Sequence, residues 1–296
     1  MNKLRRTMLY VPGNNPANLQ SAGLYGADAL ILDLEDAVSI NEKDSARHLV
    51  RNAIMSLRYE CEIAVRINHI RTPFGRADLD YILPAKPNII RLPKAESAGD
   101  IQEVADIVQK AEERYGFKPG SIKLMAAIES AEGILNVREI AKAHPRMVAI
   151  ALGGEDLIAD LKTTRSGDGL ELHYARSALL FAARSAKIDA IDSVFSRIED
   201  EEAFIREVKM IKQLGFDGKS VIHPRQIPIV HQIFAPTQQE IAYARSVLEA
   251  YDDALKRKSG VVALNGNLID QPIVTRAQRV LAYAEAVTRD ERGDFQ

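Results

Sequence analysis

The sequence predicts an α/β protein, namely a (β/α)8 TIM barrel followed by a C-terminal helical extension. Three observations support this fold class. The chain has 296 residues, close to the roughly 250 that are typical of such a barrel. Eight short apolar runs alternate with amphipathic stretches, a pattern typical of parallel strands covered by helices. The Gly-x-Gly-x-x-Gly fingerprint of an open, dinucleotide-binding sheet is absent from the sequence.

The predicted elements alternate between strand and helix along the first 225 residues. Strands are expected at 7–12, 29–35, 62–68, 88–93, 122–129, 146–154, 189–194 and 219–223. Each is a short, mostly apolar run, as expected for a strand that is buried on both faces. Amphipathic helices are expected at 15–25, 98–115, 132–143, 170–186 and 201–214, several of them opened by a capping residue or proline. We therefore predict a catalytic barrel domain over 1–225.

Roughly 70 residues follow the eighth strand, and the barrel does not need them. A helix is expected over 238–256, and the segment 261–272 is expected to form two short extended pieces about an Asn265-Gly266 turn. A last helix follows. We predict that 226–296 form a C-terminal extension that serves as a lid over the site or as an oligomer contact.

Composition favours small-molecule chemistry in the cytoplasm. The formal net charge is −2 and the basic residues are spread along the chain, so no nucleic-acid partner is expected. No apolar run approaches a membrane span, and the run after the N-terminal MNKLRR is too short for a signal peptide. The single cysteine, Cys61, cannot form an intrachain disulfide and is interpreted as a small core residue.

Charged residues gather where the predicted strands end, which is the face on which barrels of this type carry their active sites. These strand-end residues are Glu35, Asp36, Arg66, Asn68, Lys94, Glu129, Gly154, Glu155 and Asp156. Several carboxylates in a poorly solvated barrel mouth are costly unless cations accompany them. A divalent metal ion and Arg66 are the candidate cations.

Glu129 and Asp156 are the predicted metal ligands, because each ends a strand and the two strands are consecutive. Two carboxylates, with water and substrate completing an octahedron, suit Mg²⁺ better than Zn²⁺. The alternative is that both residues merely cap the helices that follow them. No His-Glu-x-x-His spacing indicates a zinc site. A Schiff base at Lys94 is conceivable, but Lys94 stands beside Glu96 just past the strand, and a solvated or paired lysine is the favoured interpretation.

Nine motifs in register then connect the chain to a known family. They are RRTMLYVPGNNPANL, LILDLEDAV with Lys43 and Ala46-Arg47 after it, VRIN, RLPKAES, AAIESAEGI, ALGGEDL, GFDGKSVIHPRQI, FAPTQQEIAYA and LNGNLIDQP. From about Arg5 to Ala286, the chain resembles the citrate lyase β-like, malyl-CoA lyase and aldolase-type metal-dependent carbon–carbon lyases. The sequence contains no nucleophile elbow and no phosphate loop.

The resemblance implies a barrel that binds Mg²⁺ through Glu129 and Asp156, with Arg66 holding a substrate carboxylate. It implies that Glu35 and Asp36 line the metal site, although a structural role in bridging strand ends remains open. The C-terminal segment would close the active site of a neighbouring subunit in a homo-oligomer. Asp270, on that segment, is the candidate acid/base residue, and its alternative role is to cap the turn before Pro272.

The resemblance also implies the reaction, a retro-Claisen cleavage of a thioester. Relatives cleave citryl carried on an acyl carrier protein, or malyl-CoA and citramalyl-CoA. Backbone N–H groups at Gly154 and Glu155 would stabilise the enolate oxygen. No cation occurs between Gly13 and Gly23, which weakens the case for free CoA and favours a carrier-borne substrate. The expected partners are the α and γ subunits of a citrate lyase. A free-CoA lyase and a catalytically silent scaffold subunit are the alternatives.

Overall fold

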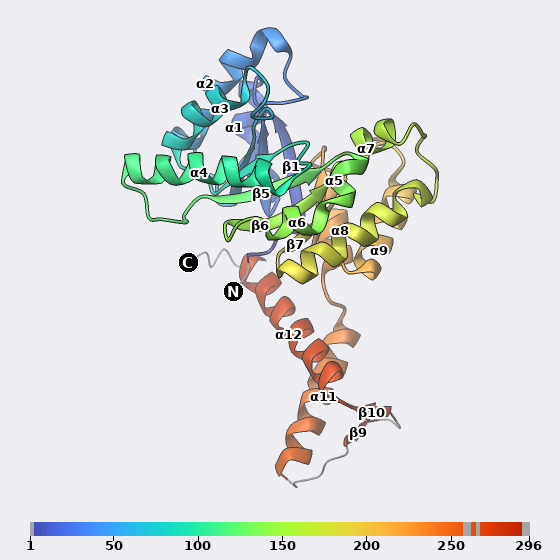
Figure 1. Ribbon diagram of the computed structural model, residues 1–296. Helices are drawn as coiled ribbons and strands as arrows, with labels where there is room; N and C mark the ends of the chain where they lie inside the picture. Colours follow the sequence, from blue (N-terminus) through green and yellow to red (C-terminus); the bar gives the residue numbers. More distant parts are fainter. Residues whose placement is uncertain (1–2, 257–261, 265–266, 292–296) are drawn as a thin grey trace. The chain divides into compact units, whose positions relative to one another are not determined.

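The computed structural model describes residues 3–256, 262–264 and 267–291, and eight of the described strands close into a parallel barrel (Figure 1). Each strand pairs with the next along the chain, and the eighth pairs with the first. They are β1 (Thr7–Pro12), β2 (Ala29–Asp33), β3 (Glu62–Arg66), β4 (Ile89–Leu92), β5 (Lys123–Ile128), β6 (Met147–Leu152), β7 (Asp189–Asp192) and β8 (Gly218–Val221). The predicted (β/α)8 barrel is confirmed.

Helices connect the strands and lie outside them (Figure 1). They are α1 (Pro16–Ser21), α2 (Lys43–Ser56), α3 (Gly75–Ile82), α4 (Ala98–Tyr115), α5 (Ala131–Leu135), α6 (Val137–Lys142), α7 (Gly154–Asp160), α8 (His173–Ala186), α9 (Glu201–Leu214) and α10 (Gln226–Phe234). Short 3₁₀ turns cover Ala22–Tyr25, Ile40–Glu42, Leu83–Ala85 and Leu170–Leu172.

Local capping explains where two of these helices begin. Ser97 and Asp100 form a reciprocal capping box at the start of α4, and Ser130 accepts a hydrogen bond from Gly133 N at the start of α5. The helix expected over 132–143 is divided at Asn136, whose side chain donates to Glu96 O and to Glu132 Oε1. Such side-chain bonds offer the backbone an alternative to the helix.

The barrel interior is filled by alternating residues of the strands. Its buried cluster consists of Met8, Ala29, Ile31, Ala64, Ile89, Met125, Ala149, Ala151 and Ile191. Because side chains on a strand alternate between its two faces, the residues two positions further along β2, β3 and β4 also point inward. Those residues are Asp33, Arg66 and Arg91, and they lie where the apolar filling gives way to the carboxyl-end opening.

Residues 1–4 and 232–296 form a second compact unit, separate from the barrel unit of residues 5–231. It contains α11 (Gln238–Lys256), the antiparallel strands β9 (Val262–Leu264) and β10 (Asn267–Ile269), and α12 (Gln271–Glu291). Its buried cluster consists of Ala244, Val247, Ile269, Val274 and Ala277. The predicted Asn265-Gly266 turn lies outside the described residues. In the described part of the chain, no helix combines the length and apolarity needed to cross a bilayer.

Candidate active site

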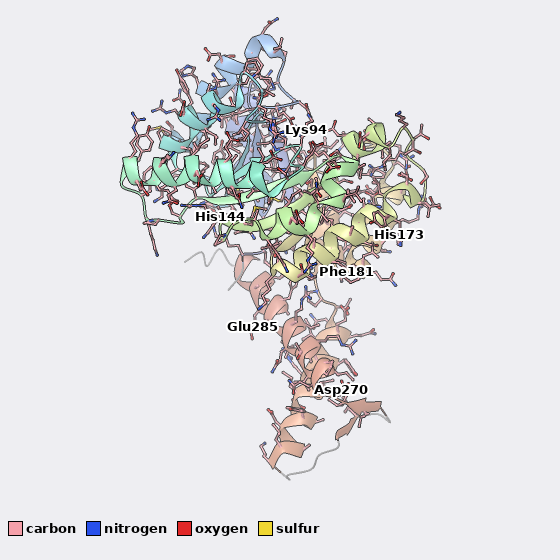
Figure 2. The ribbon with its side chains drawn as sticks, viewed as in Figure 1. Lys94, His144, His173, Phe181, Asp270 and Glu285 are labelled. Atoms are coloured by element: carbon pink, nitrogen blue, oxygen red, sulfur yellow. The ribbon has the colours of Figure 1, made fainter. Side chains whose placement is uncertain are left out.

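A cavity of about 230 Å³ opens at the carboxyl ends of the barrel strands. It is lined by Tyr10, Asp33, Asp36, Ala37, Arg66, Arg91, Glu129, Leu152, Gly153, Gly154, Glu155, Asp156, Val194, Ser220 and Ile222. Six of the nine predicted strand-end residues line it, namely Asp36, Arg66, Glu129, Gly154, Glu155 and Asp156, whereas the Asn68 side chain donates to Leu34 O and Asp78 instead. Glu35 joins them through its ion pairs, whereas Asp270 belongs to the C-terminal unit, where Figure 2 labels it.

Arg66 is held by a carboxylate that the sequence analysis did not assign to the site. Its Nε and Nη2 atoms donate to the two oxygens of Asp33 at 2.6 and 2.7 Å, and both side chains are buried. This two-point pair lowers the pKa of Asp33 against the opposing effect of burial. Arg66 also lies over the ring of Tyr10, with its Cζ atom 4.8 Å from the ring centroid. Its orientation is therefore fixed before any substrate arrives.

Glu35 connects Arg66 to Lys94. Its Oε1 atom accepts a hydrogen bond from Lys94 Nζ at 2.6 Å, and its Oε2 atom lies 3.0 Å from Arg66 Nη1 without hydrogen-bonding geometry. Burial raises the pKa of Glu35 to about 7, against the opposing effects of Arg66 and Lys94. Asp36 is half exposed and lies 3.5 Å from each of these two cations. The predicted acidic pair thus orients both cations.

Lys94 is a paired lysine in this structure. Burial lowers its pKa, but the hydrogen bond to Glu35 and the charges of Glu35 and Asp36 outweigh burial and raise it. A raised pKa keeps the amine protonated, which opposes a role as a nucleophile. Figure 2 labels Lys94, which follows β4 and has a φ of 49°. The geometry supports the paired reading over the Schiff-base reading.

Glu129 follows β5 and occupies space that a glycine leaves open. Its side chain is buried, and its Oε2 atom accepts a hydrogen bond from Lys94 N at 3.1 Å. A Cβ atom on Gly153 would lie 2.1 Å from Glu129 Cγ and 2.7 Å from Oε1, so this carboxylate requires glycine at position 153. Burial raises the pKa of Glu129 and outweighs the charges of Arg66 and Arg91, which lower it, while the charge of Asp156 adds to the rise. A cation beside both carboxylates would offset these penalties.

Asp156 and Glu155 lie in the first turn of α7, beside the same cavity. Asp156 is half-buried, and the helix cap is Gly153 with no side-chain hydrogen bond. The cap of α5 is Ser130 rather than Glu129. The capping alternative therefore has no hydrogen bond to support it among the described residues. Glu155 is 51% exposed and pairs with Arg165 at 3.0 Å.

These residues fit a magnesium ion by the chemistry of their donors. Glu129 and Asp156 offer hard carboxylate oxygens, and Asp156 lies close enough for its charge to raise the pKa of Glu129. Among the described residues, no cluster of three or more His, Cys, Asp or Glu side chains forms a complete ligand set. Glu129 and Asp156 would hold the ion, and Mg²⁺ commonly retains several waters when few carboxylates bind it.

Three further residues complete the comparison with the sequence. Arg91 lines the cavity and was not assigned to the site, because it lies inside an otherwise apolar run. Asp270 is exposed and caps α12, where its Oδ1 atom accepts a hydrogen bond from Ile273 N at 3.2 Å. Cys61 is half-buried beside the start of β3 rather than fully inside the core.

A (β/α)8 barrel with carboxylates and arginines at its mouth has the architecture and the donor groups that a metal-dependent carbon–carbon lyase requires. The HpcH/HpaI aldolase/citrate lyase family model matches residues 6–224, so the chain belongs to this family. The citrate lyase subunit beta of Leuconostoc mesenteroides subsp. cremoris is 50% identical over 285 residues, covering 96% of this chain and 94% of the relative. The (3S)-malyl-CoA thioesterase of Cereibacter sphaeroides is 35% identical, covering 95% of both chains.

A solved structure extends the similarity to three dimensions. The protein CitE from Mycobacterium tuberculosis, in complex with magnesium, acetoacetate and coenzyme A, has a TM-score of 0.78 and 32% identity. The match covers 95% of this chain and 98% of that one. The family resemblance, the lyase class and the magnesium cofactor expected from the sequence are confirmed.

Proposed function

We propose that this chain is the β subunit of a citrate lyase and cleaves a citryl thioester into oxaloacetate and an acetyl thioester. The observation that carries the proposal is the cavity itself, which places Glu129 and Asp156 beside two arginines. A citryl group presents a hydroxyl next to a carboxylate, with a second carboxylate nearby. The 50% identity to a citrate lyase subunit beta, against 35% to a malyl-CoA thioesterase, supports citryl over malyl.

The reaction requires two changes of charge. The substrate hydroxyl loses a proton as the carbon–carbon bond breaks, and the electron pair of that bond moves into the thioester to form an enolate. The enolate carbon then takes up a proton to give the acetyl thioester. Glu129 and Asp156 would hold the magnesium ion, which supplies a Lewis acid that polarises the hydroxyl and the emerging ketone.

The chain's own residues position and stabilise the reacting groups. Arg66 is oriented by Asp33, and its remaining N–H groups would donate to a substrate carboxylate. Amide groups of Gly154 and Glu155, in the first turn of α7, lack partners within that helix and would donate to the enolate oxygen. Removing one such donor typically costs about 2.7 to 4 kcal/mol of transition-state stabilisation.

Proton transfer is assigned to Asp270 on the C-terminal unit of a neighbouring subunit. Within the described chain Asp270 lies outside the barrel unit, so a lid that closes in trans would bring it to a site. The same proposal makes the chain a homo-oligomer, with residues 226–296 as the lid and oligomer contact.

The expected partners follow from the citrate lyase assignment. We propose that the chain works in the cytoplasm with α and γ subunits, and that the γ subunit carries the citryl group as an acyl carrier protein. Helix α1 has no acidic residue in its first turn and no basic residue in its last turn, and no cation occurs from Gly13 to Gly23. This segment offers no charge to the phosphates of free CoA, which favours the carrier-borne substrate.

A substrate panel tests the proposal. The purified chain is incubated with Mg²⁺ and citryl carrier protein, citryl-CoA, citramalyl-CoA or malyl-CoA, and the released 2-oxo acid is identified. Oxaloacetate from the citryl thioesters, released fastest from the carrier, is the predicted result. Cleavage of only malyl-CoA or citramalyl-CoA would establish the free-CoA lyase instead. No cleavage of any substrate would establish the silent scaffold.

A further inference from the structure

Arg91 is a buried arginine that forms no direct ion pair with a carboxylate among the described residues. The residue is 1% exposed, its Nε atom has no hydrogen-bond partner, and its Nη1 atom donates to the sulfur of Met125 at 3.9 Å. Among the described residues, no carboxylate lies within 4 Å of its guanidinium. Other buried arginines differ, since Arg6 and Arg146 each form a two-point pair with a carboxylate.

A buried cation without a carboxylate partner is expensive, because burial removes its hydration and here only the Tyr10 ring and the more distant charge of Glu129 offset that loss. Such a group persists in a cavity when a bound anion completes its coordination. Arg91 lines the cavity that contains Glu129 and Asp156, so an anion bound there would be part of the substrate.

Arg66 and Arg91 differ in which edge of the guanidinium is free to bind a carboxylate. Arg66 on β3 and Arg91 on β4 are register partners, and both guanidiniums lie against the Tyr10 ring. The Cζ atom of Arg66 is 4.8 Å from the ring centroid and that of Arg91 is 5.2 Å from it. The Nε–Nη2 edge of Arg66 is taken by Asp33. Arg91 is therefore the guanidinium that can offer a complete two-point edge to a carboxylate.

A second unpartnered polar atom faces the same cavity. The hydroxyl of Ser220, on β8, is buried and has no hydrogen-bond partner among the described residues. It lies on a strand that pairs with β1, which carries Tyr10. The cavity thus holds two unused donors, and both suit an anionic group.

We infer that Arg91 binds the distal carboxylate of the citryl group and so selects citryl over citramalyl thioesters. This inference rests on the proposed function. A citramalyl group is a citryl group in which the distal CH₂–COO⁻ is replaced by a methyl. With citramalyl bound, Arg91 would remain unpaired, and a site whose buried polar groups lose their partner rejects such an analogue strongly.

Two substitutions test the inference by comparing kcat/KM for citryl-CoA and citramalyl-CoA. Arg91→Met should lower the citryl value by about 10²- to 10³-fold, the usual effect of truncating one partner of a buried charge pair. The citramalyl value should stay within a few-fold of wild type or rise. Arg91→Lys keeps the charge but not the two-point geometry, so it should lower the citryl value by a smaller factor. Arg91→Lys also provides the test of the inference if Arg91→Met does not fold.

Arg146→Met is the matched control, because it removes a buried arginine that is paired with Glu112 before β6. It should lower stability and leave the ratio of the two kcat/KM values unchanged. An equal loss on both substrates in the Arg91 variants would make Arg91 a structural residue and overturn the inference. An unchanged kcat/KM for citryl-CoA in the Arg91 variants would also overturn the inference.

Calorimetric binding of the two 2-oxo acids separates this inference from the proposed function. With Mg²⁺ present, the wild-type chain should bind oxaloacetate more tightly than pyruvate, which lacks the distal carboxylate, and Arg91→Met should abolish that preference. If no citryl thioester is cleaved, the proposed function fails while this preference still tests Arg91. Absence of the preference in wild type, or its retention in Arg91→Met, contradicts the assignment.

Discussion

Asp33 and Arg66 are register partners on neighbouring strands, joined by two hydrogen bonds of 2.6 and 2.7 Å between buried side chains. Through Arg66, Asp33 is linked to Glu35 and Lys94, and Lys94 N in turn bonds Glu129. A carboxylate inside the barrel layer thereby positions the cations at its mouth.

The first prediction concerns this pair. Asp33→Asn keeps the size of the side chain but removes the charge that holds Arg66, so kcat/KM should fall by about 10²-fold, as expected when a positioning contact is lost. Magnesium affinity should change little, because neither proposed ligand is altered.

Asp28→Asn is the control for this prediction. Asp28 precedes the same strand and makes a similar two-point pair with Arg6 at the opposite end of the barrel. This variant should lose stability without losing activity in the fraction that remains folded. Equal kinetic loss in both variants would show that the effect is one of folding. Measurement of kcat/KM together with urea unfolding separates the two.

The second prediction uses the glycine beside Glu129. Gly153→Ala places a Cβ atom 2.1 Å from Glu129 Cγ, so the carboxylate must move. Magnesium affinity, measured by calorimetry, should fall about 10- to 100-fold, as it does when the support of a metal ligand is disturbed. Gly99→Ala, whose Cβ would meet Ser97 Oγ at 3.5 Å, is the control and should bind magnesium normally. Normal affinity in Gly153→Ala would remove Glu129 from the metal site.

The third prediction concerns stability and pH. Glu112 is buried, pairs with Arg146 at two points, and accepts hydrogen bonds from Gly120 N and Ile122 N. Burial raises the pKa of Glu112, but these contacts outweigh burial and lower that pKa to about 2. Because this value lies below that of the unfolded chain, about 4.3, the stabilisation is present above pH 4.3 and is lost as the pH falls toward 2.

Glu112→Gln should therefore cost about 3 kcal/mol at pH 7, and its deficit relative to wild type should shrink as the pH is lowered from 4 to 2. Glu113→Gln, at the exposed neighbouring position, should have little effect at any pH. Urea unfolding at pH 7 and pH 3 measures the free energy of unfolding of both variants relative to wild type. A deficit that is independent of pH would contradict the assigned pKa.

The fourth prediction tests the lid in trans. Asp270→Asn should retain magnesium binding, while kcat falls by the roughly 10²- to 10⁴-fold that is usual for a lost acid/base group. Mixing this variant with Glu129→Gln and allowing subunit exchange should restore some activity, because certain subunit pairs combine an intact lid with an intact barrel. If exchange is demonstrated and no activity returns, Asp270 only caps α12 or serves its own subunit.

The sequence was sufficient for the barrel and for the strand-end part of the site. Buried parallel strands appear as apolar runs, and Glu129 and Asp156 stand out because charge follows directly after such runs. Asp33 and Arg91 are harder to predict, since each is a charged residue within a run and only the closed barrel shows that it faces inward. Their inward orientation could have been predicted from strand alternation, because each lies two positions after an apolar residue that points into the barrel. The role proposed for Asp270 requires an arrangement between subunits, which one chain does not encode locally.

The central claim is that Glu129 and Asp156 hold the magnesium ion with which this chain cleaves a citryl thioester. The most direct measurement is the rate of oxaloacetate release from the citryl thioester as Mg²⁺ is titrated into metal-free wild type, Glu129→Gln and Asp156→Asn. Wild type should be inactive without metal and saturate as Mg²⁺ is added, whereas both variants should stay folded and inactive at every concentration. Wild-type activity in the absence of metal, or an unchanged magnesium titration in either variant, would contradict the account.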